Sequence, residues 1–112
     1  MIIQTVRESA AMVVSLSGRL DTVTAPDYEK KFDELISREE INFVVDFDKL
    51  EYISSAGLRV ILATSRRIKG KNGKIHLANI SGNVKEVFEM SGFAGIFPVY
   101  GTVAEALKMI TG

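Results

Sequence analysis

Residues 41–62, INFVVDFDKLEYISSAGLRVIL, contain the strand-to-helix transition that decides the fold. The run INFVVDF at 41–47 is nearly continuous in apolar residues, as expected of a central strand covered on both faces. A helix from about residue 56 to 69 follows, with apolar residues at helical spacing and cations near its C-terminal end. KIHLA at 74–78 predicts another strand. Together they predict a βαβ unit with a right-handed crossover between parallel strands.

The residues before this unit predict a hairpin and a first helix. Residues 12–17 alternate between apolar and polar positions, which indicates a strand that Gly18 then breaks. Residues 2–7 form a weaker strand pattern, with a turn near residues 9–11. Thr24 is a candidate cap, and Pro26 and Asp27 are suited to a first helical turn. We therefore expect a helix to about Ser37.

The C-terminal third predicts two more helices and a last strand. Ser81 is a candidate cap for a third helix, and Gly92 follows its end. Residues 97–100 are a candidate strand. Thr102 and Glu105 have the spacing of a capping box at the start of a final helix. The fold class is thus α/β, with a mixed β-sheet of four to five strands and about four α-helices.

The length and composition favour one soluble domain spanning residues 1–112. A chain of 112 residues with 46% hydrophobic and 25% charged residues is long enough to bury a core. Lys plus Arg and Asp plus Glu both number 14, so we expect neither direct nucleic acid binding nor membrane binding. Cysteine is absent, which excludes disulfides and thiol chemistry. No secretion signal or bilayer-spanning run is visible, so we expect a cytoplasmic protein.

Two serines, Ser54 and Ser55, occupy the predicted junction between the central strand and its helix. Binding groups in α/β folds collect beyond the carboxyl ends of strands, and a helix N-terminus favours negative charge. A phosphate on Ser55 would be tolerated at this position without disturbing the core. The ordinary role of serine at such a place is helix capping, which stabilises by about 1 kcal/mol.

The sequence gives little support to catalysis. SSAG at 54–57 lacks the Gly-x-Ser-x-Gly elbow of serine hydrolases, and the one histidine, His76, lies inside a predicted strand. A lone histidine there is usually a surface or satisfied side chain rather than a metal ligand. GKNG at 70–73 lacks the ending of a phosphate-binding loop and predicts a turn.

Several segments together resemble the STAS domain family of anti-sigma factor antagonists. YISSAGLRVIL at 52–62 is similar to the family's signature, and Ser55 falls on its phosphorylated position. SGRLDTVTAP at 17–26 resembles the second strand and its loop. MSGFAGIFPVY at 90–100 and AEAL at 104–107 extend the similarity to the C-terminal part, although core packing is the simpler interpretation of most of residues 90–97.

The resemblance implies a protein-binding switch rather than an enzyme. The unphosphorylated domain would bind an anti-sigma factor that is also a serine kinase, and so release the sigma factor. Phosphorylation of Ser55 would end the binding, and a serine phosphatase would reverse it. This chain itself needs no cofactor. The expected partner-binding residues are Asp21, Thr22, Ser54, Ser55, Ala56, Gly57 and Arg59.

Some of these roles have alternatives. Asp21 also suits a turn or cap, Arg59 a solvent-exposed position, and Asp46 a structural role in bonding loop amides near Ser55. Sporulation-type and stress-type members of the family carry aspartate before the switched serine, whereas this chain has Ser54, a second hydroxyl that is a candidate for modification. The alternative function is an unphosphorylated scaffold, or a subunit of a transporter or signalling complex.

Overall fold

A computed structural model describes residues 1–111 of the chain. The elements follow one another as β1 (Ile2–Glu8), β2 (Ala11–Leu20), α1 (Ala25–Ser37), β3 (Asn42–Ile53), α2 (Ser55–Gly70), β4 (Lys74–Ala78), α3 (Gly82–Met90), the 3₁₀ turn η1 (Phe93–Gly95), β5 (Val99–Tyr100) and α4 (Val103–Thr111). None of the helices in these residues is long and apolar enough to cross a bilayer.

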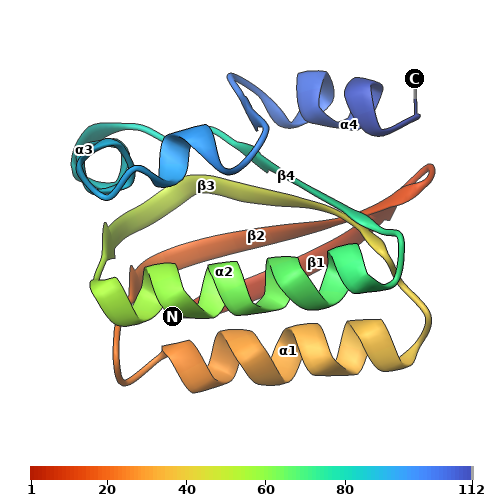
Figure 1. Ribbon diagram of the computed structural model, residues 1–112, viewed down its shortest axis with the longest axis horizontal. Helices are drawn as coiled ribbons and strands as arrows, with labels where there is room; N and C mark the ends of the chain where they lie inside the picture. Colours follow the sequence, from red (N-terminus) through yellow and green to blue (C-terminus); the bar gives the residue numbers. More distant parts are fainter. Residues whose placement is uncertain (112) are drawn as a thin grey trace.

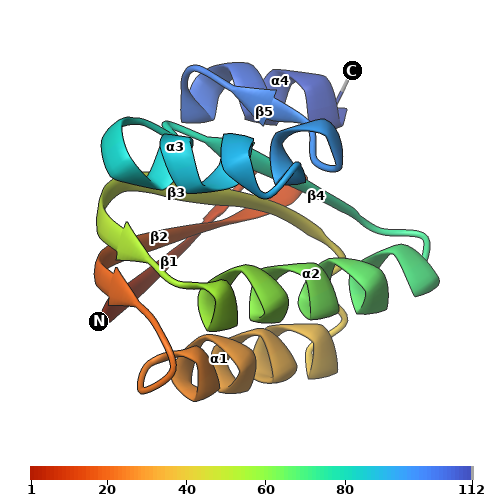
Figure 2. The same cartoon turned by 60° about the vertical axis from the view of Figure 1, so that its left-hand side comes forward.

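The strands form one five-stranded sheet in the order β1-β2-β3-β4-β5. β1 pairs with β2 in the antiparallel sense, and the remaining neighbours are parallel. Helices α1 and α2 cover one face of the sheet, while α3, η1 and α4 cover the other (Figures 1 and 2). The predicted α/β class, with a mixed sheet and about four helices, is therefore confirmed.

Apolar side chains from both faces of the sheet form the core. Tyr28 and Phe32 of α1 stack with ring centroids 4.5 Å apart, and Phe32 lies 5.0 Å from Phe43 of β3. All three are fully buried. Burying one such side chain stabilises the fold by roughly 1.5–3 kcal/mol. A smaller apolar cluster joins α4 to the other face of the sheet and comprises Ala11, Val13, Val44, Ala78, Ala106 and Ile110.

Two predicted strand ends were wrong. β2 does not end at Gly18, because this glycine takes a φ of 93° at an irregularity in the pairing with β3 and the strand resumes to Leu20. β3 does not end at residue 47, because Leu50 and Ile53 return to the core in its second half. The two extensions pair with each other, so each strand supplies the hydrogen bonds that the other needs.

The helix caps follow the predictions only in part. At α4 the amide of Glu105 donates to Thr102 Oγ1 at 3.1 Å, as the capping box predicts. Thr24 makes no side-chain cap, because its hydroxyl instead donates to the carbonyl of Arg19. Ser81 precedes α3 without a side-chain cap hydrogen bond. The last strand is shorter than residues 97–100, because it begins only after Pro98, which has no N–H.

His76 of β4 is a buried, satisfied side chain rather than a surface one. Its Nδ1 lies 3.3 Å from the carbonyl oxygen of Ala106, and its ring centroid lies 5.1 Å from that of Tyr100. Burial lowers the pKa of His76, the charge of Lys74 lowers it further, and the hydrogen bond with the Ala106 carbonyl opposes these effects. The neutral imidazole is thus the form that the folded state favours.

A pH dependence follows from the lowered pKa of His76. Because the unfolded chain binds this proton at a higher pH than the folded chain, stability is fully present above the unfolded pKa and falls as the pH decreases toward the folded one. Urea unfolding at about pH 7.5 and about pH 5.5 should show a larger loss of unfolding free energy for the wild type than for His76→Gln. An equal loss in both proteins would contradict this origin of the acid sensitivity.

Candidate functional site

The β3–α2 junction gives different roles to its two serines. Ser54 is extended, with φ −102° and ψ 176°, and its Oγ accepts a hydrogen bond from the amide of Gly57 at 3.3 Å. The predicted capping role thus belongs to Ser54. Ser55 begins α2 and is exposed, and within residues 1–111 no hydrogen bond of its hydroxyl is seen. The hydroxyl of Ser55 is therefore the accessible one.

Gly57 fixes this junction against the end of β2. It is buried in the first turn of α2, where an added Cβ would lie 2.7 Å from the carbonyl oxygen of Leu20. The same carbonyl accepts a hydrogen bond from the amide of Ser54 at 3.0 Å. The close approach of these two backbone segments is possible because residue 57 has no side chain.

Asp21 organises the connection from β2 to α1. Its Oδ1 accepts hydrogen bonds from the amides of Val23 at 3.0 Å and Thr24 at 3.2 Å. The Thr24 amide has the largest effect in lowering the pKa of Asp21, with help from Val23, the Thr24 hydroxyl and Arg19, while partial desolvation opposes them. The turn role considered for Asp21 is therefore the one that its side chain performs, as an ionised acceptor.

Two residues at this edge of the sheet, Arg19 and Tyr52, were not identified from the sequence. Arg19 and Tyr52 are register partners at the ends of β2 and β3, and the guanidinium carbon of Arg19 lies 4.1 Å from the centroid of the Tyr52 ring. Arg19 Nε also lies 3.6 Å from Asp21 Oδ2. Finding this pair required extending both strands past Gly18 and Phe47, since only then do the two residues meet.

The predicted site residues come together at one edge of the sheet. β2 and β3 are parallel, so the turn into α1 and the turn into α2 lie side by side (Figure 2). Thr22, Ala56 and Arg59 line an open groove between the two helices, of about 360 Å³. Asp21, Ser54, Ser55 and Gly57 lie in the two adjoining turns rather than in its lining. Arg59 is exposed and makes no ion pair in the part of the chain that the structure describes.

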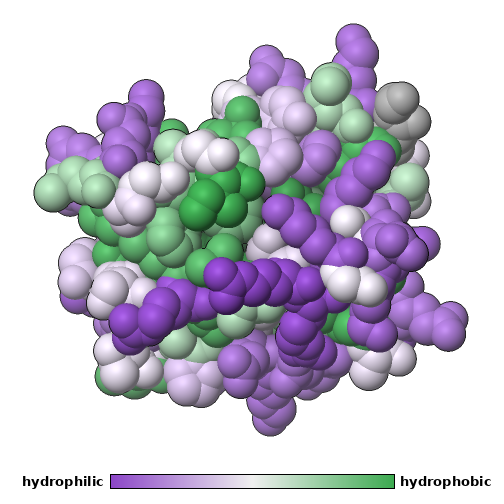
Figure 3. Space-filling view, viewed as in Figure 1, coloured by the Kyte–Doolittle hydropathy of each residue, from purple (hydrophilic) through white to green (hydrophobic). Residues whose placement is uncertain are grey.

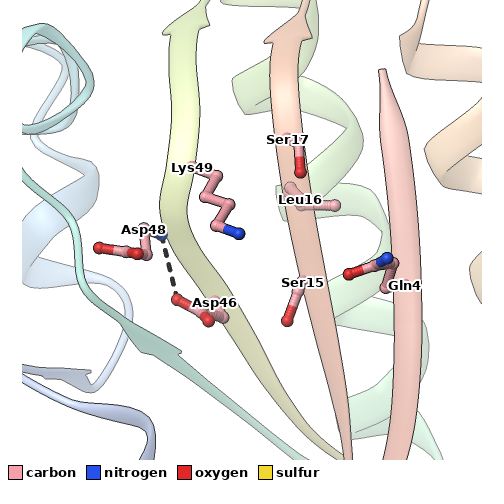
Figure 4. A pocket seen from close by; sticks show the side chains of 7 residues that line it. All are labelled: Gln4, Ser15, Leu16, Ser17, Asp46, Asp48 and Lys49. Atoms are coloured by element: carbon pink, nitrogen blue, oxygen red, sulfur yellow. Dashed lines mark hydrogen bonds between the residues drawn. The ribbon is translucent and has the colours of Figure 1, made fainter.

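Asp46 has a structural role, as expected, although its partners differ in part from those predicted. Its Oδ1 accepts hydrogen bonds from the amide of Asp48 within β3 and from Nδ2 of Asn79, at 3.0 and 2.9 Å. These groups are not loop amides beside Ser55. Asp46 also lines a polar hollow of about 120 Å³. Figure 4 shows it there on β3 with Lys49, beside Ser15 of β2.

The segment MSGFAGIF at 90–97 contains both core and surface residues. Phe97 is buried and Phe93 packs against the core, as the simpler interpretation predicted. Met90 and Ile96, in contrast, are 87% and 44% exposed. In the space-filling view, an apolar area lies beside α3, whereas hydrophilic side chains run along α1 and α2 (Figure 3).

Comparison with known proteins identifies similar chains. The family model described as STAS domain matches residues 2–106. BtrV of Bordetella bronchiseptica is 36% identical over 88 residues, covering 79% of this chain and 76% of that protein. The anti-sigma F factor antagonist of Paenibacillus polymyxa is 32% identical over 97 residues, covering 86% and 83%. The crystal structure of an anti-sigma factor antagonist from Mycobacterium paratuberculosis superposes with a TM-score of 0.90 at 25% identity, covering 99% and 94%.

Proposed function

Because the chain belongs to the STAS domain family, we propose that it is an anti-sigma factor antagonist controlled by phosphorylation of Ser55. The unphosphorylated form binds an anti-sigma factor that is a serine kinase and thereby releases the sigma factor. The phosphorylated form does not bind, and a serine phosphatase restores the active form. The names of the relatives support the antagonist role. ATP and magnesium act in the kinase, so this cytoplasmic chain is a substrate and binding protein rather than an enzyme.

The exposure of Ser55 at the start of α2 carries the proposal. The amides of Ser55 and Ala56 precede the first intrahelical hydrogen bond, which Leu58 N donates to Ser54 O at 3.0 Å. Free amides and the helix dipole favour negative charge at this end. A phosphate would add roughly 1.5–2 negative charges to the surface while leaving the cap and the core in place. The fold therefore persists, and the change is presented to a partner.

The proposed contact surface consists of the two turns around Ser55. Thr22, Ala56 and Arg59 offer side chains to a partner, while Ser54 and Asp21 shape the turns beside them. Gly57 is buried, so it contributes through the position of the backbone rather than through contact. The first turn of α2 contains no acidic residue. A phosphate on Ser55 would therefore introduce negative charge into this turn.

The test is intact-mass measurement and site mapping after incubation with ATP, magnesium and a purified candidate anti-sigma kinase. We expect one added phosphate on Ser55, lost in Ser55→Ala and retained in Ser54→Ala. The second substitution is a control, because the Ser54 hydroxyl is half-buried and bonded to Gly57. Phosphate on Ser54 would contradict the assignment. A stable complex without any phosphate would favour the scaffold function, which the serine at position 54 in place of aspartate makes a specific alternative.

A further inference from the structure

The groove between α1 and α2 is lined by two matched stripes of residues. Four lining residues come from the turn before α1 and its first two turns, and four come from the first three turns of α2: Thr22, Ala25, Pro26 and Glu29, and Ala56, Arg59, Val60 and Ala63. Both sets have the spacing i, i+3, i+4, i+7. Within a helix this spacing places residues on one side. The groove therefore runs along the N-terminal halves of the two helices.

Small residues keep the groove open, and buried residues close it below. Three of the eight lining residues are alanine, and Val60, only 7% exposed, lies at the floor. Tyr28 of α1 and Thr64 of α2 are buried between the helices and the sheet. Toward the far end, Arg67 of α2 forms an ion pair with Asp33 of α1. The two helices are thus held side by side, and the groove is a fixed feature of the fold.

We propose that this groove seats an amphipathic helical segment of the anti-sigma factor kinase. The inference rests on the proposed function and adds the place and chemistry of the partner's contact. A small or medium apolar side chain of the segment lies on Val60 and the alanines. An acidic side chain meets Arg59 and a basic one meets Glu29, since these two exposed charges lie on different helices at the rims and have no ion-pair partner within residues 1–111.

The shape and charge of the groove favour this occupant over a second copy or a small molecule. A concave groove needs a convex occupant, and two copies facing each other through this surface would leave both grooves unfilled. The groove is also open to solvent. It would bury only a modest share of a small molecule's surface, whereas specific small-molecule sites enclose most of it.

The position of Arg59 also explains how phosphorylation would reach the groove. Ser55 and Arg59 are four residues apart in α2, so their side chains are neighbours on the helix surface. A phosphate on Ser55 would pair with the Arg59 guanidinium and compete with the partner's acid for it. The same phosphate would repel that acid. Modification at one end of the groove would therefore remove its main charged contact.

The test uses Ala63→Tyr, which fills the groove two helical turns, or about 12 Å, beyond Ser55. Ala104→Tyr in α4 is the matched control, because Ala104 is also an exposed alanine in a helix and lies across the sheet from the groove. Unphosphorylated wild type and variants are titrated calorimetrically with the purified kinase. We expect Ala63→Tyr to raise the Kd at least about tenfold and Ala104→Tyr to leave it within about twofold.

A second variant tests the contribution of the Arg59 charge. Arg59→Gln should also raise the Kd, and the added weakening should shrink as salt is increased, because the lost contact is an ion pair. Circular dichroism confirms that each variant is folded before titration.

The outcomes separate the groove from the proposed function. If Ala63→Tyr and wild type have equal Kd values and Ser55→Asp does not bind, the groove is not the binding site of the kinase, but the proposed antagonist function stands. Absence of wild-type binding would overturn both. A change in the sedimentation of the free chain caused by Ala63→Tyr alone would show a second copy in the groove and overturn the partner assignment.

Discussion

Gly57→Ala is expected to lower the free energy of unfolding by roughly 1–3 kcal/mol, the range for forcing an extra methyl group into a packed site. The new Cβ would lie 2.7 Å from the carbonyl oxygen of Leu20 and 2.8 Å from Cγ1 of Ile53. The Ile53 side chain is buried in the core, and the Leu20 carbonyl belongs to the backbone and is held by the amide of Ser54. The clash can therefore be relieved only if the start of α2 moves away from the end of β2.

Gly70→Ala in the same helix provides the control. A Cβ at Gly70 would have no atom within 4 Å, and Gly70 has no positive φ. Because alanine has the higher helix propensity, this change should leave stability unchanged or raise it by up to about 1 kcal/mol. Urea unfolding of both variants, followed by circular dichroism, measures the difference. Similar effects of the two changes would show that the contact with Leu20 is not what requires glycine at 57.

The order of the elements was predictable because local patterns determine it. β4 has the predicted bounds, and α1 ends at the predicted Ser37, since helical spacing from Tyr28 to Ile36 and the flanking breakers are visible in a single segment. The second halves of β2 and β3 were missed for the opposite reason. DKLEYI at 48–53 shows no regular alternation, and its strand form depends on pairing with residues 17–20, which are distant in the sequence.

The candidate site was predictable as two turns but not as a surface. The resemblance indicated the segments around Asp21 and Ser55, and parallel pairing brought their ends together. The resemblance did not show that Ser54 is the cap and that Ser55 has the exposed hydroxyl, because this depends on which serine oxygen reaches the Gly57 amide. The groove could not be predicted either, since it requires α1 and α2 to lie side by side with alanines between them.

Ser55→Asp is expected to weaken binding of the anti-sigma kinase on the order of 100-fold, because a like-charge contact across an interface costs several kcal/mol. The carboxylate would sit at the N-terminus of α2, where the fold tolerates it, so stability should change little. Ser55→Ala should bind as the unmodified wild type does and resist phosphorylation. Calorimetric titration of the three proteins with the kinase provides the comparison.

Ser81→Asp separates the position of the charge from the charge itself. Ser81 is an exposed serine directly before α3, so this variant adds the same carboxylate at another helix N-terminus. If phosphorylation acts through local repulsion at the turn into α2, Ser81→Asp should bind the kinase like the wild type. If both aspartate variants weaken binding equally, the net charge of the chain controls the partner. If neither does, Ser55 lies outside the interface and the switch proposed for it is wrong.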